Sequence, residues 1–510
     1  MATIKERYDK QKNTRQPYLD RAEECAKHTI PYAFIEDTLT GQDDLERYFS
    51  QGYGAMLVKH IVGKLALSIL PPSQPFYRLA PTQEALEVVA GNDTSAVYEI
   101  EKLLARKEEA CLRIINKSNF RASLYPSLVL SVITGNAIVE KTDKGYIVHN
   151  LRNFTTKRDY NGEIIELIIV EKKDFTTLPT EFQSSISDDD KEDELELYTL
   201  VERQDDGTYI IKQEIVGEDV GEEITIKNFN EMFIDVGWNK IDGEHYRRSF
   251  VEDYLGSFIS LEKLETILYD GVAEKTKIVK FMNPNGMTDI EDYKDANHGD
   301  VISGEASDLT SEDARDIADE RALKELIDGI KQELARAFLV TGSSIRDSER
   351  TTAYEVQQVA SEVEASLGGI YTYISDNIQR PLVIQSMSEV DISEDKDIDI
   401  IITTGIQALG RNVELSKINN MINQLGVLAS VTSVEEVAKY LNVGNIISSI
   451  IANSGVASKE FIYSPKDMDA IEKAKKEEAI AQQMLQGGLS QAGMNIANQT
   501  TQGGQNGNLS

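Results

Sequence analysis

The stretch from Val340 to Gly369, VTGSSIRDSERTTAYEVQQVASEVEASLGG, decides how the chain is organised. Its first part, Thr341–Arg350, is short and polar and carries charges of both signs. A capping-box pattern at Thr352–Glu355 then opens a long amphipathic helix, and another such helix ends just before the polar part. This arrangement is unlike an enzyme pocket and is typical of a loop presented into a channel.

Two long helices are predicted before this loop, and they flank a short insert. The first starts at the capping box Ser249–Glu252 and runs to Lys277, which gives about 28 residues and a length of ~42 Å. The second runs from near Ser311 to Leu339. Their predicted core faces carry Tyr254, Phe258, Leu261, Leu264, Leu268 and Val272, and Ile317, Leu323, Leu326, Ile330, Leu334 and Phe338.

The insert, Ile278–Leu309, is predicted to be a small α/β or β unit. Asn283–Gly286 reads as a turn and Asp300–Gly304 as the end of a strand. On the exposed side of the second helix, Glu320 is spaced to pair with Lys324, and Asp328 is spaced to pair with Lys331.

The N-terminal half changes from helical to β periodicity. Apolar residues have helical spacing between Tyr18 and Leu70, and again over Ala96–Asn116 and the apolar run Leu124–Val139. A period of two follows over Gly145–Asp235, so this region is predicted to be antiparallel β structure. The supporting details are Leu57, Ile61, Leu65 and Ile69 at four-residue steps before Pro71-Pro72, hairpin signals at Asn161-Gly162 and Asp206-Gly207, and the acidic run Ser184–Glu196, predicted as a solvated loop.

The third long helix begins at Thr352, is expected to bend at Gly368-Gly369, and is expected to end or kink at Pro381. A strand is predicted at Ile398–Thr403, then a helical cluster over Gln407–Tyr463. The third helix's core face carries Val356, Val359, Val363, Leu367, Ile370, Ile374 and Ile378, and Gln486–Ser510 is predicted to be disordered. The whole pattern predicts an α+β protein that is mainly helical.

Composition excludes several classes of protein. With 510 residues, 41% hydrophobic content and 27% charged content, the chain should form two or more folded domains. A net charge of −33 argues against a surface that grips nucleic acid, because such surfaces need clustered Lys and Arg. Two cysteines, Cys25 and Cys111, imply no disulfide framework. The charged N-terminus and the lack of an apolar run of about 18 residues predict a soluble protein made in the cytoplasm, with no membrane contact.

No enzyme motif is found. The phosphate loop GxxxxGK[ST], the GxGxxG turn, HExxH and GxSxG are all absent from the sequence. The 86 acidic residues are too many for any pair of them to indicate a metal-dependent nuclease. We therefore predict no enzymatic activity, no catalytic residues, no metal site and no cofactor.

Several motifs, in order along nearly the whole chain, resemble one family. They are Arg15–Pro31 (RQPYLDRAEECAKHTIP), Leu65–Pro71 (LALSILP), Gly243–Ser249 (GEHYRRS), Ser348–Val356 (SERTTAYEV), Leu367–Tyr371 (LGGIY) and Thr403–Arg411 (TTGIQALGR). The chain resembles the portal, or head-to-tail connector, proteins of short-tailed double-stranded DNA phages of the autographivirus or podovirus type.

The resemblance implies a phage portal fold and a ring of twelve copies at one capsid vertex. Its implied regions are a wing (1–248 and 352–406), stem helices (249–277 and 311–339) around a clip (278–310), a tunnel loop (340–351), a crown (407–466) and a C-terminal tail (467–510). The implied role is a conduit for genome packaging and ejection, a docking site for the motor and then the tail, and a nucleus for procapsid assembly.

The implied partners are other copies of the chain, non-specific double-stranded DNA in the channel, the terminase large subunit, the tail adaptor or tail tube protein, the major capsid protein, and scaffolding and internal core proteins. The implied location is the virion, with host cytoplasm as the place of assembly. A tail adaptor or collar ring protein is an alternative, although such proteins are usually shorter, and a packaging nuclease is a further one.

The candidate DNA-channel residues lie on the tunnel loop and the second stem helix. They are Ser343, Ser344, Arg346, Asp347, Ser348, Glu349 and Arg350 on the loop, and Lys331 and Arg336 on the helix. The cations among them are candidates for transient contact with phosphates. The alternative is that Arg346 pairs with Asp347 or Glu349, and that the two helix cations pair along their own helix.

Overall fold

The computed structural model describes residues 3–34, 52–71, 75–82, 94–186, 194–276, 280–311, 317–340, 362–363, 365–367, 369–390, 398–402, 420–424 and 473. The chain divides into two compact units. The first comprises residues 1–77, 111–393 and 402–409, and the second comprises residues 78–110, 394–401 and 410–510.

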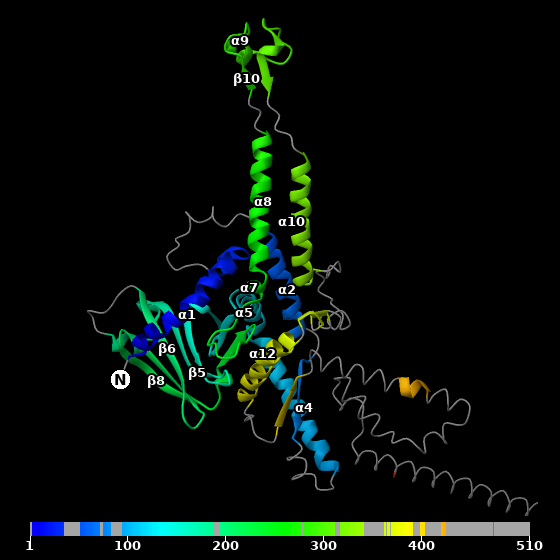
Figure 1. Ribbon diagram of the computed structural model, residues 1–510. Coiled ribbons are helices and arrows are strands. Elements are labelled where there is room, and N and C mark those ends of the chain that lie inside the picture. Colours follow the sequence, from blue (N-terminus) through cyan, green and yellow to red (C-terminus); the bar gives the residue numbers. More distant parts are fainter. Residues whose placement is uncertain are drawn as a thin grey trace, which may run out of the picture. The chain divides into compact units, whose positions relative to one another are not determined.

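A five-stranded antiparallel sheet belongs to the first unit, and each strand pairs with the next one in sequence (Figure 1). The two predicted hairpin turns are confirmed: Gly162 and Gly207 have φ of +83° and +87°, which glycine adopts without steric cost. The acidic run that was predicted as a loop contributes its ends to α6 (Thr180–Ser185) and β6, while residues 187–193 lie outside the described part. The strands are β4 (Phe154–Arg158), β5 (Ile164–Asp174), β6 (Glu194–Arg203), β7 (Tyr209–Ile215) and β8 (Glu218–Ile226).

Helices α1 (Ile4–Lys27) and α6 pack on opposite faces of this sheet. Successive side chains of a strand point to opposite faces, and in β6 the buried odd residues face the α6 side while the buried even residues face the α1 side. Glu214 of β7 fixes the start of α1. Its carboxylate accepts hydrogen bonds from the amides of Ile4, at 2.6 Å, and Lys5, at 3.3 Å. The α1 side contains Ile4, Tyr8, Ile168, Tyr198 and Leu200, and the α6 side contains Phe182, Leu195, Leu197, Ile215 and Val220.

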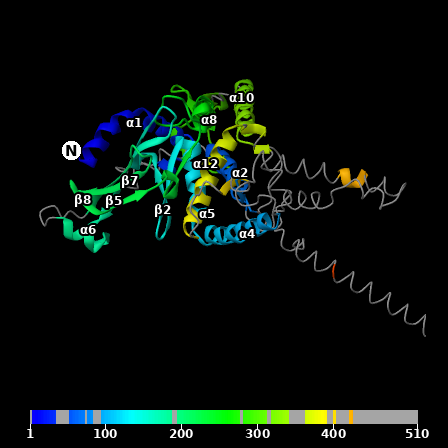
Figure 2. The ribbon, with the colours of Figure 1, turned by 90° about the horizontal axis from the view of Figure 1, so that it is seen from below.

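A three-stranded sheet of order β3-β2-β9 packs against α5 (Phe120–Thr134) and α12 (Gly369–Ser388) in the same unit (Figure 2). The strands are β2 (Asn136–Thr142), β3 (Gly145–Asn150) and β9 (Phe233–Gly237). Gly135 ends α5 with a φ of +80°, so the apolar run Leu124–Val139 is divided between a helix and a strand. Strand β2 begins before the region in which the sequence predicted β structure.

Asp235 of β9 is half-buried between two buried arginines. Its Oδ2 lies 2.8 Å from a guanidinium nitrogen of Arg158, and its Oδ1 lies 2.8 Å from one of Arg247. Burial alone would raise the pKa of Asp235, but the charges and hydrogen bonds of Arg158 and Arg247 outweigh burial and hold the pKa below its usual value. The three side chains form a group with a net positive charge, and its two arginines are buried.

Helix α2 (Tyr53–Ile69) packs against α5, and the residues predicted to line its core face are buried. Pro381 was predicted to end or kink its helix; an end there is wrong, because α12 continues to Ser388. Proline removes a single amide donor, and the buried residues that follow it keep α12 packed. Of the predicted core face of this third helix, Val363, Ile374 and Ile378 are buried, Leu367 is half-buried, and Val356, Val359 and the side chain of Ile370 lie outside the described part.

The long helix predicted over Ser249–Lys277 consists of two helices, α7 (Phe250–Asp253) and α8 (Leu255–Thr276). Ser249 caps α7 as predicted, and its Oγ accepts a hydrogen bond from the Glu252 amide at 3.0 Å. In one continuous helix Phe250 and Phe258 would be ~12 Å apart along the axis. The break at Tyr254 allows both rings to contact Phe338, with centroids at 4.8 and 5.7 Å.

The insert after α8 contains β10 (Lys280–Met282), α9 (Ile290–Asp295) and β11 (Leu309–Ser311), and β10 pairs with β11. The turn predicted at Asn283–Gly286 is confirmed by a hydrogen bond from the Gly286 amide to the Asn283 carbonyl. The strand end predicted at Asp300–Gly304 is wrong. Val301 is almost fully exposed there, so burial gives a strand no advantage.

The second unit is described over part of its length. Strand β12 (Ile398–Ile402) confirms the prediction at Ile398–Thr403 and pairs with β1 (Tyr77–Pro81). Helix α4 (Thr94–Lys117) confirms the prediction at Ala96–Asn116, and the unit boundary follows Ala110. Of the helical cluster predicted over 407–463, residues 420–424 are helical, and the rest of it and the tail 486–510 lie outside the described residues.

Candidate nucleic-acid interface on helices α8 and α10

Helices α8 and α10 (Ile317–Ala337) pack side by side in antiparallel directions (Figure 1). Phe258 of α8 contacts Phe338, just beyond the end of α10, and Glu265 of α8 pairs with Lys331 of α10 at 2.7 Å. Phe258 and Glu265 are seven residues apart in the chain, and so are Lys331 and Phe338. The two contacts therefore follow one face of both helices over about two turns. On α10, Ile327, Leu334 and Phe338 are buried, whereas Leu326, which was predicted for this face, is exposed.

The base of the helix pair is an aromatic cluster. Phe338 lies at its centre and contacts Phe250, Tyr254 and Phe258, with ring centroids 4.8 to 5.8 Å away. Trp238, which follows β9, contacts Phe250 with the ring centroids 5.1 Å apart and the ring planes tilted by 37°. This cluster therefore connects the helix pair to the three-stranded sheet.

Lys331 is half-buried and ion-paired, so it is not a free cation. Its ammonium pairs with Glu265 of α8, not with Asp328 as predicted, and it lies 5.6 Å from the centre of the Tyr53 ring. The hydrogen bond from Lys331 to Glu265 is the main cause that raises the pKa of Lys331. The partner differs from the prediction because Glu265 is buried between the helices, where its carboxylate needs a cation.

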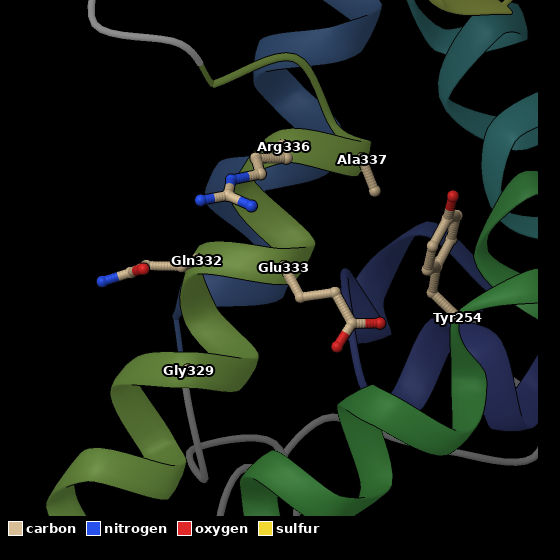
Figure 3. A pocket seen from close by; sticks show the side chains of 6 residues that line it. All are labelled: Tyr254, Gly329, Gln332, Glu333, Arg336 and Ala337. Carbon is tan, nitrogen blue, oxygen red and sulfur yellow. The ribbon is translucent and has the colours of Figure 1, made fainter.

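Arg336 is exposed and lies on another side of α10, since five residues correspond to ~140° of rotation. It borders a shallow groove together with Tyr254, Gly329, Gln332, Glu333 and Ala337. Figure 3 shows that Glu333 and Ala337 face Tyr254, whereas Arg336 and Gln332 point to the opposite side. Among the described residues Arg336 makes no ion pair, whereas Lys331 pairs with Glu265.

The two predicted residues that the structure describes do not form one basic patch. Lys331 and Arg336 point in different directions, and the exposed charges around them on α10 have both signs, as Arg321, Lys324, Glu325, Asp328 and Glu333 show. The seven loop candidates lie outside the described residues: Ser343, Ser344, Arg346, Asp347, Ser348, Glu349 and Arg350. A surface of mixed charge favours brief contacts with DNA over tight binding.

The end of α10 has an unusual backbone. Leu339 has a φ of +61°, a left-handed conformation that costs an L-residue roughly 1–2 kcal/mol. Its amide donates to the Arg336 carbonyl and the Val340 amide donates to the Ala335 carbonyl, which is the helix-ending pattern in which glycine is usual. The buried Leu339 side chain, 3% exposed, compensates for the unfavourable backbone.

Two side chains of α2 hold the Leu339 carbonyl. Lys64 donates to it at 2.7 Å and His60 donates from Nε2 at 3.2 Å. Burial is the main cause that lowers the pKa of His60, and the charge of Lys64 lowers it further, so the ring is neutral at pH 7. The sequence analysis missed both residues. The available signal was a lysine within the apolar helical run 57–70.

Within the described residues, none of the helices has the length and apolar content needed to cross a bilayer. The same residues contain no group of three or more His, Cys, Asp or Glu side chains arranged to hold a metal ion.

Comparison with known proteins gives a consistent set of matches. Residues 1–462 match the model of a family described as bacteriophage head to tail connecting protein. The chain is 27% identical to the portal protein of Escherichia phage T7 over 509 residues, covering 96% of this chain and 92% of that protein. It is 26% identical to the portal protein of Enterobacteria phage SP6, covering 95% and 94%.

A third relative, the portal protein of Pseudomonas phage phiKMV, is 28% identical and covers 94% of this chain and 95% of its own length. Among solved structures, a chain from the neck of an empty gene transfer agent particle matches with 11% identity and a TM-score of 0.38, over 72% of this chain and 86% of that one.

Proposed function

This chain belongs to the family of bacteriophage head to tail connecting proteins, and we infer from that membership that it is the portal protein of a short-tailed phage. The observation that carries the inference is the match of residues 1–462, which spans both compact units. We assign it a structural role without enzymatic activity, in line with the names of its relatives.

We propose that twelve copies form a ring at one vertex of the capsid, through which the genome enters and leaves. The ring would dock the terminase large subunit during packaging and the tail adaptor or tail tube protein afterwards, and it would contact the major capsid protein, scaffolding and core proteins during assembly in the host cytoplasm. In this proposal α8 and α10 are the stem, residues 278–310 are the clip, and residues 340–351 are the tunnel loop.

The charge of the chain suits such a channel. Twelve copies at −33 each would carry a formal charge of roughly −400, which repels DNA and lets a duplex slide without adhering. The antiparallel packing of α8 and α10 supports a stem, because two paired helices present a continuous lateral surface. Arg336 supports local phosphate contact, because it is exposed and makes no ion pair among the described residues.

Negative-stain electron microscopy of the purified full-length protein, together with its mass in solution, tests this proposal. We expect rings with a central hole and a mass of twelve chains. If scaffolding protein is required for assembly, rings should appear once it is added. A monodisperse monomer that forms no rings even with scaffolding protein would overturn the proposal.

The DNA-contact role of the loop is tested with the double variant Arg346→Gln/Arg350→Gln. If these arginines touch phosphates, we expect particles carrying the variant to package or retain severalfold less DNA while ring assembly is unchanged. Lys10→Gln/Lys12→Gln, which removes two exposed cations from α1, is the matched control and should leave DNA content unchanged. Loss of ring assembly in the arginine variant would instead assign Arg346 and Arg350 a structural role.

A further inference from the structure

A lysine ammonium is buried where α10 ends. Lys64 of α2 is 1% exposed, although it is charged and lies among apolar residues. Its Nζ donates to the Leu339 carbonyl at 2.7 Å and lies 3.1 Å from the Glu362 carboxylate. A buried ammonium is very unfavourable unless it is paired and hydrogen-bonded, so the position of Lys64 is fixed by these two partners.

The two partners of Lys64 lie at the two ends of one segment. Leu339 precedes residues 341–361, and Glu362 follows them. This segment contains all seven loop residues for which we predict a role in the channel. One buried side chain on α2 therefore contacts the chain both where it enters the segment and where it leaves it.

We propose that Lys64 is a positioning residue for the channel loop, because it fixes the Leu339 carbonyl and the Glu362 carboxylate to α2. The proposal depends on the portal function inferred above. His60 assists at the first end only, through its hydrogen bond to the Leu339 carbonyl. Lys64 contacts both Leu339 and Glu362, so its removal should loosen these two residues from α2 more than the removal of His60 does.

The chemistry of the site requires a lysine. An ammonium has three donors at the end of a flexible stem, so it bonds a carbonyl and a carboxylate together. Methionine fills a similar volume and donates nothing. Glutamine at position 362 keeps an acceptor and removes the charge, so Glu362→Gln weakens the second contact without touching the first.

Hydrogen exchange of the assembled full-length ring tests the anchor directly, with Lys64→Met, Lys64→Arg and Glu362→Gln as variants. The Leu339 and Val340 amides are the probes, because both close the last turn of α10. In Lys64→Met we expect these amides to exchange at least tenfold faster, while amides in α8 keep their wild-type rates. Lys64→Arg should recover part of the protection, and Lys59→Met, an exposed lysine on the same helix, is the matched control.

The second readout is the amount of double-stranded DNA in particles that carry each variant, measured beside electron microscopy of the rings. Faster exchange confined to the end of α10, with intact rings and reduced DNA content, would support the proposal. Unchanged exchange of the Leu339 and Val340 amides in Lys64→Met would overturn the proposal. An equally large increase of the exchange rates in α8 would also overturn it, because Lys64 would then only stabilise the fold. Faster amide exchange at the end of α10 with a normal DNA content would overturn the positioning role. It would leave ring formation, and thus the portal function, unaffected.

If Lys64→Met does not fold, Glu362→Gln decides the question, since the Glu362 side chain is partly exposed and tolerates the change more readily. We expect faster exchange at the Glu362 and Val363 amides and a smaller fall in DNA content than for Lys64→Met. Wild-type values for both quantities would overturn the proposal.

Discussion

Replacement of Phe338 by alanine is expected to lower the free energy of unfolding by about 3–5 kcal/mol. Phe338 is fully buried and contacts the rings of Phe250, Tyr254 and Phe258. The substitution removes these contacts and leaves a cavity that neighbouring helices cannot easily close, because α7 and α8 are held by their own packing.

Trp238 provides the measurement, because it is the single tryptophan and it contacts Phe250 within the same cluster. Urea denaturation of the full-length protein followed by tryptophan fluorescence should show the loss as a lower midpoint. Leu326→Ala is the matched control: it is 58% exposed on the same helix and should change stability by less than about 0.5 kcal/mol. A loss below about 1 kcal/mol for Phe338→Ala would show that the cluster does not join the helix pair to the sheet.

Replacement of Asp235 by asparagine is expected to cost about 3–5 kcal/mol, because it leaves two buried guanidinium groups without a counter-charge. Arg158 and Arg247 lie 2.8 Å from opposite oxygens of this carboxylate, and both are buried. The matched control is Asp376→Asn, which removes a surface ion pair with Arg380 and should cost about 0.5 kcal/mol or less. Equal effects of the two substitutions would contradict the assignment of Asp235 as the counter-ion of the two buried arginines.

The contribution of Asp235 to the free energy of unfolding should decrease as the pH falls. Its pKa in the folded protein lies below its value in the unfolded chain, so its stabilising effect is complete above the unfolded value of about 3.9. The effect is lost as the pH falls through the folded pKa, where the carboxylate takes up a proton. The stability difference between wild type and Asp235→Asn should therefore be constant above about pH 5 and shrink in acid, and urea midpoints from pH 7 to pH 3 measure it.

Local patterns in the sequence predicted much of the fold. Hairpins were placed correctly at Gly162 and Gly207, because a turn with positive φ needs glycine and leaves a clear signature. The four-residue steps of α2 and the alternation in β5 to β7 also identified those elements. Their signals arise within a few residues, and burial in the folded chain agrees with them.

Features that depend on distant contacts were not predicted. The break at Tyr254 exists because Phe250 and Phe258 contact Phe338, about 80 residues later in the chain, and periodicity carries no information on that contact. Pro381 was expected to end or kink its helix, and α12 continues past it. Val301 lies in an apolar pair typical of strands but is exposed, so the expected strand is absent there.

At the candidate site, too, local features could be predicted from the sequence and contacts between distant residues could not. Arg336 was predicted to contact phosphates; it is exposed, and the contact itself stays a prediction. The partner of Lys331 was predicted on its own helix, but the paired carboxylate, that of Glu265, belongs to α8. No role was predicted for Lys64, since a charge in an apolar run has no obvious partner in the sequence. Its partners lie 275 and 298 residues away.

The antiparallel pairing of α8 with α10 has a consequence for how this part of the chain can change in length. Phe258 with Phe338 and Glu265 with Lys331 share one register, in which a step of seven residues up one helix matches seven residues down the other. An insertion into one helix alone would move every later side chain away from its partner. Related chains in which these two helices are longer or shorter should therefore differ by equal numbers of residues in both helices, preferably in steps of seven, whereas the insert between them is free to vary independently.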